Sequence, residues 1–182
     1  MNKAYNRDIL DWDSFPDYDI ICCDPPWEQK MVNYFETLMF KSGQIKPQNT
    51  IIDILQKLAK LSHKNKPVFI EYSIKGYKKV IDTMVNEGHL FYSCVESLQE
   101  NGKPYCILVL NSIDFEPDGT KQGFNIIDFT CDNFKFKTVF DPFAGIGKTA
   151  KRFIKNNKTY IGSEINTQRL NKLKEVLWAE QQ

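Results

Sequence analysis

Four consecutive residues, Asp24, Pro25, Pro26 and Trp27, bring together a carboxylate, two proline carbonyls and an indole. They follow a short apolar run from Asp19 to Cys23, which has the length and composition of a buried strand. Proline cannot continue such a strand, so the chain must leave the sheet at this point. The sequence therefore predicts that this polar and aromatic group lies at the rim of a sheet.

This set of groups suits the activation of an amine on a nucleobase. Such an amine is a poor nucleophile, because its lone pair is delocalised into the ring. A carboxylate and a proline carbonyl that accept the two amine hydrogens would favour a tetrahedral nitrogen and free the lone pair. An aromatic face can hold the base by stacking, as flipped bases are held. The alternative is a plain strand followed by a rigid turn with a half-buried tryptophan.

A second motif lies near the end of the chain. The run Thr138 to Phe140 predicts a strand, Lys148 to Asn156 a helix, and Thr159 to Ser163 another strand that ends in Glu164. The loop after the first of these strands reads Asp141, Pro142, Phe143, Ala144, Gly145, Ile146 and Gly147. Glu164 follows these glycines by about 20 residues, the spacing expected of a carboxylate that binds ribose hydroxyls.

The loop is not a complete phosphate-binding motif. It lacks the third glycine of a dinucleotide fingerprint, and Pro142 occupies the position where a P-loop needs its first glycine. A nucleotide-like ligand without a phosphate clamp fits better, and S-adenosylmethionine is such a ligand. Gly145 and Gly147 would let the backbone approach its methionine half.

The two motifs both follow predicted strands, and ligands of open α/β sheets bind beyond the carboxyl ends of strands, where the strand order reverses. If the two strands are neighbours, a methyl donor and a target amine would meet across one crevice. Glu71 and Tyr72, at the end of the next strand, would then line it. The alternative is two unrelated turns in one sheet, with ordinary polarity at the end of that strand.

The order of the motifs resembles that of the amino-methyltransferases of nucleic acids. Asp24 to Trp27 matches their catalytic motif and Asp141 to Gly147 their cofactor loop, in the order of the permuted β-type DNA methyltransferases. MT-A70-like adenosine methyltransferases carry the same final tryptophan. Asp8, just before the catalytic strand, lies where this family has an acidic residue near the adenine of the cofactor. The loop departs from the usual Gly-Ser-Gly-Thr-Thr, since this chain has Gly145-Ile146-Gly147-Lys148-Thr149.

The resemblance implies a role for each matched residue. Asp24 and the Pro25 carbonyl would accept the amine hydrogens, and Trp27, with Pro26, would pack on the flipped base. Glu164 would hold the ribose and Asp8 would approach the adenine of the cofactor, and Asp24 would also lie beside the cofactor. The loop residues expected to contact S-adenosylmethionine are Asp141, Phe143, Ala144, Gly145 and Gly147. No metal is needed, because the sulfonium supplies the leaving group.

The expected fold class is α/β, a three-layer Rossmann-like methyltransferase sheet. It is mostly parallel, has a circularly permuted motif order, and contains one antiparallel hairpin, Leu90–Leu98 with Tyr105–Leu110, joined at Asn101-Gly102. Helical spacing predicts helices at Asn49–Ser62 and Lys75–Glu87, and a final helix capped by Asn166.

Three other segments carry weaker signals. The region Glu28–Gln48 is expected to be a long loop with at most one helical turn. Asn111–Gln122 is expected to be a turn-rich connection, and Phe124–Phe136 does not decide between helix and strand. Residues 1–182 are expected to form a single methyltransferase domain with no separate target-recognition domain. Any target specificity would then come from the two loops, from a homo-oligomer or from a partner subunit.

The composition is that of an ordinary globular protein, with 42% hydrophobic and 26% charged residues and a net charge of +1. There is no global signal for nucleic acid, and local basic runs such as Lys148–Lys158 fit phosphate contacts or solvated helix faces equally well. The five cysteines form no C-x-x-C pair, so we expect free thiols, no metal and a cytoplasmic location, and no apolar stretch is long enough to span a membrane.

The function expected from these motifs is methyl transfer from S-adenosylmethionine to a nucleobase amine. The final tryptophan of the catalytic motif favours adenine N6, with DNA as the nucleic-acid partner. Methylation of RNA adenine N6 or of DNA cytosine N4 is an alternative within the same chemistry. An inactive cofactor-binding subunit of a methyltransferase complex is an alternative of another class, and the intact Asp24 argues against it.

Overall fold

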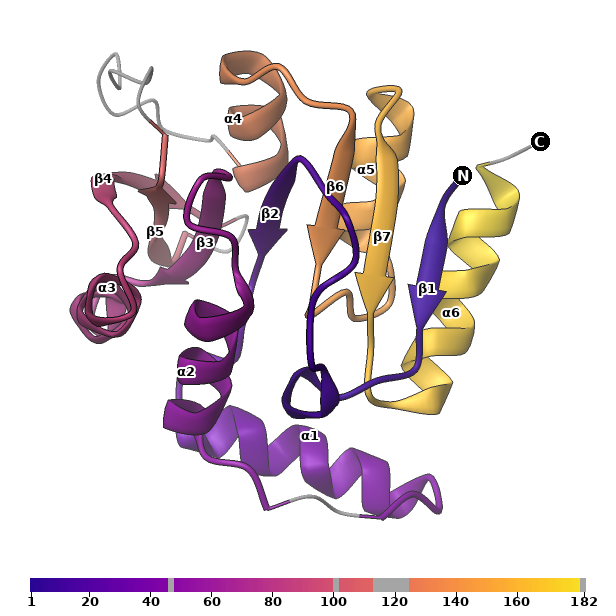
Figure 1. Cartoon of the computed structure of the whole chain (residues 1–182). Coiled ribbons are helices and arrows are strands. Elements are labelled where there is room, and N and C mark those ends of the chain that lie inside the picture. The colour runs from indigo at the N-terminus through magenta and orange to yellow at the C-terminus, as the bar shows by residue number, and fades with distance from the viewer. Residues whose placement is uncertain (46–47, 100–101, 113–124, 181–182) are drawn as a thin grey trace.

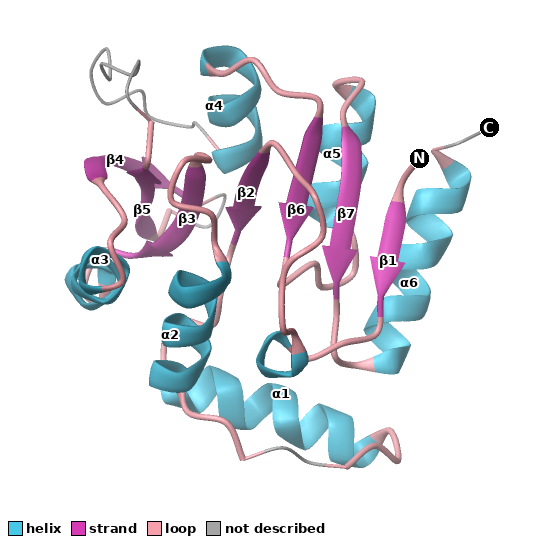
Figure 2. Cartoon of the chain, viewed as in Figure 1, coloured by secondary structure: helices cyan, strands magenta, loops and turns pink. Residues whose placement is uncertain are grey.

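The described strands form one sheet in the order β1-β7-β6-β2-β3-β5-β4, shown in Figures 1 and 2. The structure, a computed structural model, describes residues 1–45, 48–99, 102–112 and 125–180. The strand bounds are β1 Lys3–Tyr5, β2 Ile20–Cys23, β3 Val68–Ser73, β4 Phe91–Leu98, β5 Pro104–Leu110, β6 Thr138–Asp141 and β7 Thr159–Ser163. The five strands from β1 to β3 in this order pair in parallel, and β5 and β4 are antiparallel, which confirms the predicted fold class.

Helices cover both faces of the sheet, and α1 crosses the edge at which the parallel strands end (Figure 1). The bounds are η1 Ile9–Asp11, α1 Gln29–Lys41, α2 Ile51–Leu61, α3 Tyr77–Asn86, α4 Ile126–Asn133, α5 Lys148–Lys155 and α6 Thr167–Ala179. Residues of η1, α2 and α3 share one buried apolar cluster, and residues of α4, α5 and α6 share the other. Among the described residues, no helix is long and apolar enough to cross a membrane.

The central strand β2 contributes to both clusters because side chains alternate between the two faces of a strand. Ile21 and Cys23 belong to the cluster with α2 and α3, whereas Ile20 and Cys22 belong to the cluster with α4 to α6. A strand that is apolar on both faces reads as a continuous hydrophobic run, which is why its position was predictable. All five cysteines of the chain are free thiols.

The prediction of a loop over Glu28–Gln48 was wrong, because Gln29–Lys41 form the thirteen-residue helix α1. Val32, Glu36 and Met39 make its buried face at the helical spacing of four and three residues. Glu36 interrupts the apolar periodicity of this face in the sequence, since a glutamate is normally expected to be exposed to solvent. Its burial is possible because Oε1 accepts a hydrogen bond of 2.8 Å from the backbone N–H of Asn49.

Other boundaries follow from capping. Thr50 and Asp53 form a capping box that starts α2 two residues later than the predicted Asn49. Asn125 accepts hydrogen bonds from two backbone N–H groups and starts α4, so Ile126–Asn133 of the segment that the sequence left undecided form a helix. The hairpin is present, but its turn at 100–101 lies outside the described residues, as do 113–122 of the predicted connection.

Candidate active site

The strands that carry the two motifs are neighbours. Strand β2 pairs in parallel with β6, with Ile20 opposite Val139 and Ile21 opposite Phe140. From this pair the chain continues to β3 on one side and to β7 on the other, so the strand order reverses here. A ligand site is expected at such a switch point, beyond the carboxyl ends of the strands. The predicted juxtaposition of the two motifs is therefore present.

A cavity of about 180 Å³ lies at this edge and receives residues from both motifs. The predicted site residues that line it are Asp8, Asp24, Pro25, Pro26, Phe143 and Glu164. The helix α1 contributes Met31, Val32, Phe35, Glu36 and Met39 to the same cavity. Trp27, Asp141, Ala144, Gly145 and Gly147 lie outside the lining residues, and their predicted contacts with a cofactor stay predictions.

Within the first motif, the tryptophan contacts the aspartate. The indole Nε1 of Trp27 donates a hydrogen bond of 2.8 Å to Oδ1 of Asp24. Tyr72 of β3 donates its hydroxyl to the Trp27 carbonyl oxygen, also at 2.8 Å. The rest of the turn offers two prolines, which have no N–H to donate. Trp27 and Tyr72 therefore make the hydrogen bonds that tie this turn to the sheet.

The Asp24 carboxyl lies among other acidic groups. The surrounding protein and the nearby Glu71 raise its pKa, with a smaller contribution from Asp141, and the hydrogen bond from Trp27 opposes them. Asp24 is nevertheless exposed and lines the cavity, so solvent weakens its electrostatic interactions with Glu71 and Asp141. Because its pKa is raised, the Asp24 carboxyl takes up a proton more readily than an ordinary aspartate, and it lies beside the cavity.

In the second motif, Asp141 holds the loop together. It is 2% exposed, and its two oxygens accept hydrogen bonds of 2.9 Å from the Phe143 backbone N–H and from the Tyr160 hydroxyl. Burial raises the pKa of Asp141 to about 7, and the two hydrogen bonds oppose this shift. Ala144 donates its backbone N–H to the Ser163 carbonyl at 2.9 Å, which ties the loop to β7.

The two glycines of the loop adopt positive φ angles, +58° at Gly145 and +87° at Gly147. A Cβ atom on Gly147 would lie 3.0 Å from Leu173 of α6, so this glycine permits close packing of the loop on that helix. A Cβ atom on Gly145 would lie 2.8 Å from the Arg169 guanidinium. The glycines thus make room for α6 and for Arg169.

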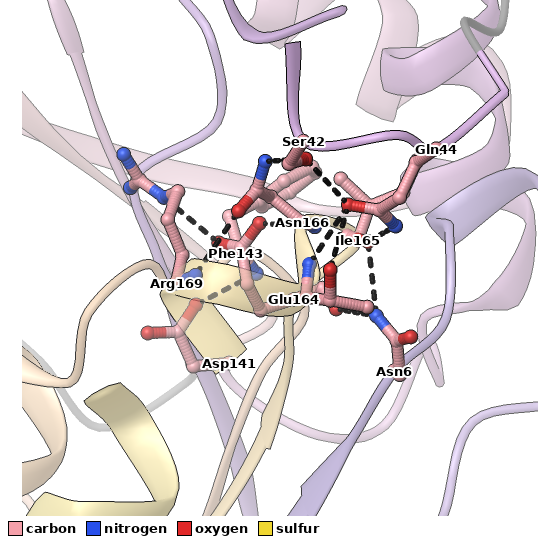
Figure 3. Close-up of polar contacts among 10 residues, drawn as sticks. Asn6, Ser42, Gln44, Asp141, Phe143, Glu164, Ile165, Asn166 and Arg169 are labelled. Atoms are coloured by element: carbon pink, nitrogen blue, oxygen red, sulfur yellow. Dashed lines mark hydrogen bonds and ion pairs between the residues drawn. The ribbon is translucent and has the colours of Figure 1, made fainter. Parts of the chain in front are cut away.

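Glu164 follows β7, is buried and lines the cavity. Figure 3 shows its contacts with Asn166 and Arg169. Its Oε1 accepts a hydrogen bond of 2.8 Å from the Asn166 backbone N–H, and its Oε2 lies 3.4 Å from Nε of Arg169. Burial raises the pKa of Glu164, while Asn166 and Arg169 lower it. These contacts orient the carboxylate where the predicted ribose would lie.

Asp8 also lines the cavity and is the N-cap of η1. Its Oδ1 accepts the Leu10 backbone N–H at 3.0 Å, and its Oδ2 accepts Nδ2 of Asn49 at 2.7 Å. Asn49 in turn donates its backbone N–H to Glu36 of α1. A chain of hydrogen bonds therefore links the predicted adenine end of the site to α1.

The segment after α1 is fastened to the turn that carries Glu164, and we call this contact the α1 clasp (Figure 3). Gln44 donates Nε2 to the Ile165 carbonyl at 2.9 Å, and its Oε1 accepts from the Thr167 backbone N–H and hydroxyl at 2.9 and 3.1 Å. Asn166 reaches Oγ of Ser42 at 3.5 Å. The α1 clasp holds the end of this helix beside the turn that carries Glu164.

Comparison with known proteins gives structural matches alone, since no protein-family model and no curated protein matches the sequence. M1.HpyAVI, solved also with SAM, matches with a TM-score of 0.67 at 15% identity over 97% of this chain and 99% of the other. TTHA0409 of Thermus thermophilus, assigned as a DNA modification methylase, matches in its complex with S-adenosyl-L-methionine with a TM-score of 0.64 at 12% identity, over 99% and 94% of the two chains. The PvuII DNA methyltransferase, specific for cytosine N4, gives 0.62 at 11% identity over 95% and 85%.

This chain has the DNA methyltransferase fold. The match extends over nearly the whole chain in each case, so it includes the sheet and the helices on both faces. At these identities the likeness establishes the fold, and the reaction has to be argued from the site.

Several residues of the site were not found from the sequence. Arg169 lines the cavity, and its guanidinium lies 4.9 Å from the centre of the Phe35 ring. Its position in the first turn of the helix after Glu164 was an available signal. Glu36 and Asn49 carried none, because they reach the cavity through α1 and the turn before α2, and neither did Arg7, which reaches it from the segment between β1 and η1.

The basic runs are partly internal. Lys66 contacts Asp17 and the Tyr18 carbonyl, and Arg152 pairs with Asp128 at 2.7 Å. Lys64 and Lys66 also precede β3, so they lie at the edge opposite the cavity. For these residues the structure favours intramolecular roles over contacts with a substrate at the site.

Asp141 should make stability depend on pH. Its pKa of about 7 in the folded chain lies above the value of about 3.9 in an unfolded one. Folding therefore favours the protonated form of Asp141. Its contribution to stability is fully present below pH ~4 and is lost as the pH rises through about 7. The free energy of unfolding of wild type minus that of Asp141→Asn should be larger at pH 5 than at pH 8. Denaturant titrations at several pH values measure it, with the exposed Asp13→Asn as control, and a difference independent of pH contradicts the assignment.

Removing the α1 clasp should loosen α1 without unfolding the sheet. Gln44→Ala deletes its three hydrogen bonds to Ile165 and Thr167, so amide hydrogen exchange in α1 should become about tenfold faster, while exchange in β2 and β6 stays unchanged. Gln56→Ala, an exposed glutamine of α2, is the matched control. Equal protection of α1 in Gln44→Ala and wild type would show that the clasp does not hold the helix.

Proposed function

We propose that this chain transfers the methyl group of S-adenosylmethionine to the exocyclic amine of a nucleobase, with adenine N6 of DNA as the substrate. The observation that carries the proposal is the shared cavity at the β2–β6 switch point that both motifs line. Asp24, Pro25 and Pro26 reach it from β2, Phe143 from the loop after β6, and Glu164 from the end of β7.

The charges around the cavity fit this cofactor. Carboxylates outnumber guanidinium groups among the lining residues, which are Asp8, Asp24, Glu36 and Glu164 against Arg7 and Arg169. S-adenosylmethionine carries two positive groups and one carboxylate and no phosphate, so it matches a site that is acidic and has no phosphate loop. Glu164 would hold its ribose hydroxyls, Asp8 would face its adenine, and Arg169 is placed to meet its carboxylate.

The chemistry assigns separate tasks to the residues of the first motif. When bound, S-adenosylmethionine supplies a methyl group on a sulfonium that leaves as a neutral thioether. Asp24 and the Pro25 carbonyl accept the two amine hydrogens and direct the nitrogen lone pair at that methyl group. One N–C bond forms as the S–C bond breaks, and the amine proton passes to Asp24. Pro26 and the Trp27 ring pack on the base.

Exposed lysines support a nucleic-acid substrate. Lys75, Lys78 and Lys79 follow the carboxyl end of β3, and Lys30 lies in the first turn of α1, so all four lie at the edge of the sheet that carries the cavity. Phosphates beside a flipped base would meet this group. The sheet and the helices that cover it account for most of the described residues. We therefore propose a short or relaxed target site, or recognition that needs a second copy or a partner subunit.

Cytosine N4 of DNA is the second candidate, favoured by the structural likeness to the PvuII enzyme. Its amine offers the same two hydrogens to Asp24 and Pro25. Adenine N6 in RNA is a third, since the motif ends in the tryptophan of the MT-A70-like enzymes. The free thiols fit a reducing compartment such as the cytoplasm.

The substrate is tested by transfer of a tritiated methyl group to double-stranded DNA, single-stranded DNA and RNA, followed by digestion and nucleoside analysis. We expect label in N6-methyladenine from DNA. Label in N4-methylcytosine alone, or in RNA alone, replaces the adenine assignment, and label on none of the nucleic acids contradicts the proposed function.

The two halves of the site should separate on mutation. Asp24→Ala should bind S-adenosylmethionine with near-native affinity and lose about 10² to 10⁴ in the rate of methyl transfer, because it removes the group that orients the amine. Glu164→Ala should weaken cofactor binding by about 1.5–3 kcal/mol, the scale of a charge-assisted hydrogen bond, and keep part of its turnover at saturating cofactor.

Calorimetry with the cofactor and single-turnover methyl transfer measure both effects, with the exposed Asp13→Ala as control. An Asp24→Ala variant that methylates at the wild-type rate would mean that the motif is only a turn.

A further inference from the structure

Trp27 is joined to the proposed catalytic carboxylate by its polar edge. An indole has a single hydrogen-bond donor, and here it points at Oδ1 of Asp24, 2.8 Å away. Within the described part of the chain, no hydrogen bond reaches Oδ2 of Asp24. One oxygen of the carboxylate is therefore held by the protein, and the other is left without a described partner in a residue that is exposed and lines the cavity.

Tyr72 fixes the tryptophan in turn. Its hydroxyl donates to the Trp27 carbonyl oxygen at 2.8 Å, and the two rings lie 6.3 Å apart at 42°. Tyr72 is 2% exposed, and a Cβ atom on Gly76 would come within 2.8 Å of its ring, so the ring has little freedom to move. Asp24 is thus linked through Trp27 to a rigid side chain of the neighbouring strand β3.

We propose that Trp27 is a positioning residue, whose indole N–H holds one oxygen of Asp24 so that the other faces the target amine, and that the Tyr72 hydroxyl fixes Trp27 for this task. The inference rests on the proposed function and deepens it. It gives the tryptophan a role that phenylalanine, with the same aromatic face but no donor, cannot perform.

The donor has an electrostatic consequence, because a hydrogen bond to the charged form of a carboxyl favours that form. The hydrogen bond from Trp27 lowers the pKa of Asp24. It thereby opposes two acidic groups that raise this pKa, which are Glu71 from β3 and Asp141 from β6. The other charged groups around the cavity are Arg7, Asp8, Glu36, Glu164 and Arg169. Without the indole N–H, the pKa of Asp24 rises further, and a smaller fraction of the enzyme holds the carboxylate that must accept the amine hydrogens.

The kinetic test is the pH dependence of single-turnover methyl transfer. In Trp27→Phe we expect the acidic limb of the profile to move up by about half to one pH unit, and the plateau rate to fall about 3- to 10-fold. Affinity for S-adenosylmethionine should stay within about twofold, because Trp27 lies outside the cavity lining. Tyr72→Phe should lower the plateau rate in the same way, with a smaller shift of the limb.

Trp178→Phe is the matched control, since this tryptophan is exposed at the end of α6, and its profile should equal that of wild type. A Trp27→Phe profile with an unmoved limb overturns the inference, because stacking alone then accounts for the residue.

A second measurement is independent of catalysis. The chain has three tryptophans, and the indole N–H resonance that disappears in Trp27→Phe identifies Trp27 in a proton–nitrogen spectrum. This resonance should shift with pH in wild type and lose the shift in Asp24→Ala. A flat titration in wild type overturns the contact whether or not the protein is active. A titrating resonance in a protein that methylates no nucleic acid would instead remove the proposed function, and the positioning role with it.

Discussion

The parallel pairing of β2 with β6 is the constraint on which the site depends. Each strand is only four residues long, and each ends in a turn that leaves the sheet at an acidic residue followed by proline. Parallel strands direct their carboxyl ends to the same edge, so the two turns emerge side by side. Because β3 and β7 lie on opposite sides of this pair, their ends add Tyr72 and Glu164 to the same edge. The chemistry is assembled by strand order, from segments more than a hundred residues apart.

The second feature is the concentration of acidic groups at that edge. Asp24, Asp141 and Glu164 are each placed where the surrounding protein raises the pKa, and each is given donors that offset part of the cost. The donors differ with the task. Asp141 is buried, has both oxygens occupied and serves the loop, whereas Asp24 is exposed, accepts one described hydrogen bond and lines the cavity. Exposure and hydrogen bonding together thus distinguish Asp141 from Asp24, the carboxyl that we propose to be reactive.

The helix α1 crosses the edge of the sheet that carries the cavity. It places apolar residues and Glu36 in the cavity, and it is fixed at its end by Gln44 and near its start by Gln29, which donates to the Asn49 carbonyl and accepts from the Ile51 backbone N–H. These polar contacts add to the apolar contacts of Val32, which belongs to the buried cluster of η1, α2 and α3.

Much of this protein was determined by the sequence alone. The strands β2, β3, β6 and β7 and the helices α2, α3, α5 and α6 were predictable because they bury apolar residues with regular spacing and end at prolines, glycines or capping residues. The two motifs were recognisable for the same reason, since their residue types and spacing are local. Local sequence patterns do not encode the contacts between distant segments, and the tertiary structure decided these.

The helix α1 is the clearest example of such a decision. Its buried face contains Glu36, whose burial is offset by a hydrogen bond from the backbone of Asn49, a partner that only the folded chain supplies. Arg169 and Asn49 enter the site through packing between distant segments, and the indole of Trp27 contacts Asp24 because of the geometry of one turn. Periodicity reports which residues avoid water, and the partners of buried polar groups depend on which elements meet in three dimensions.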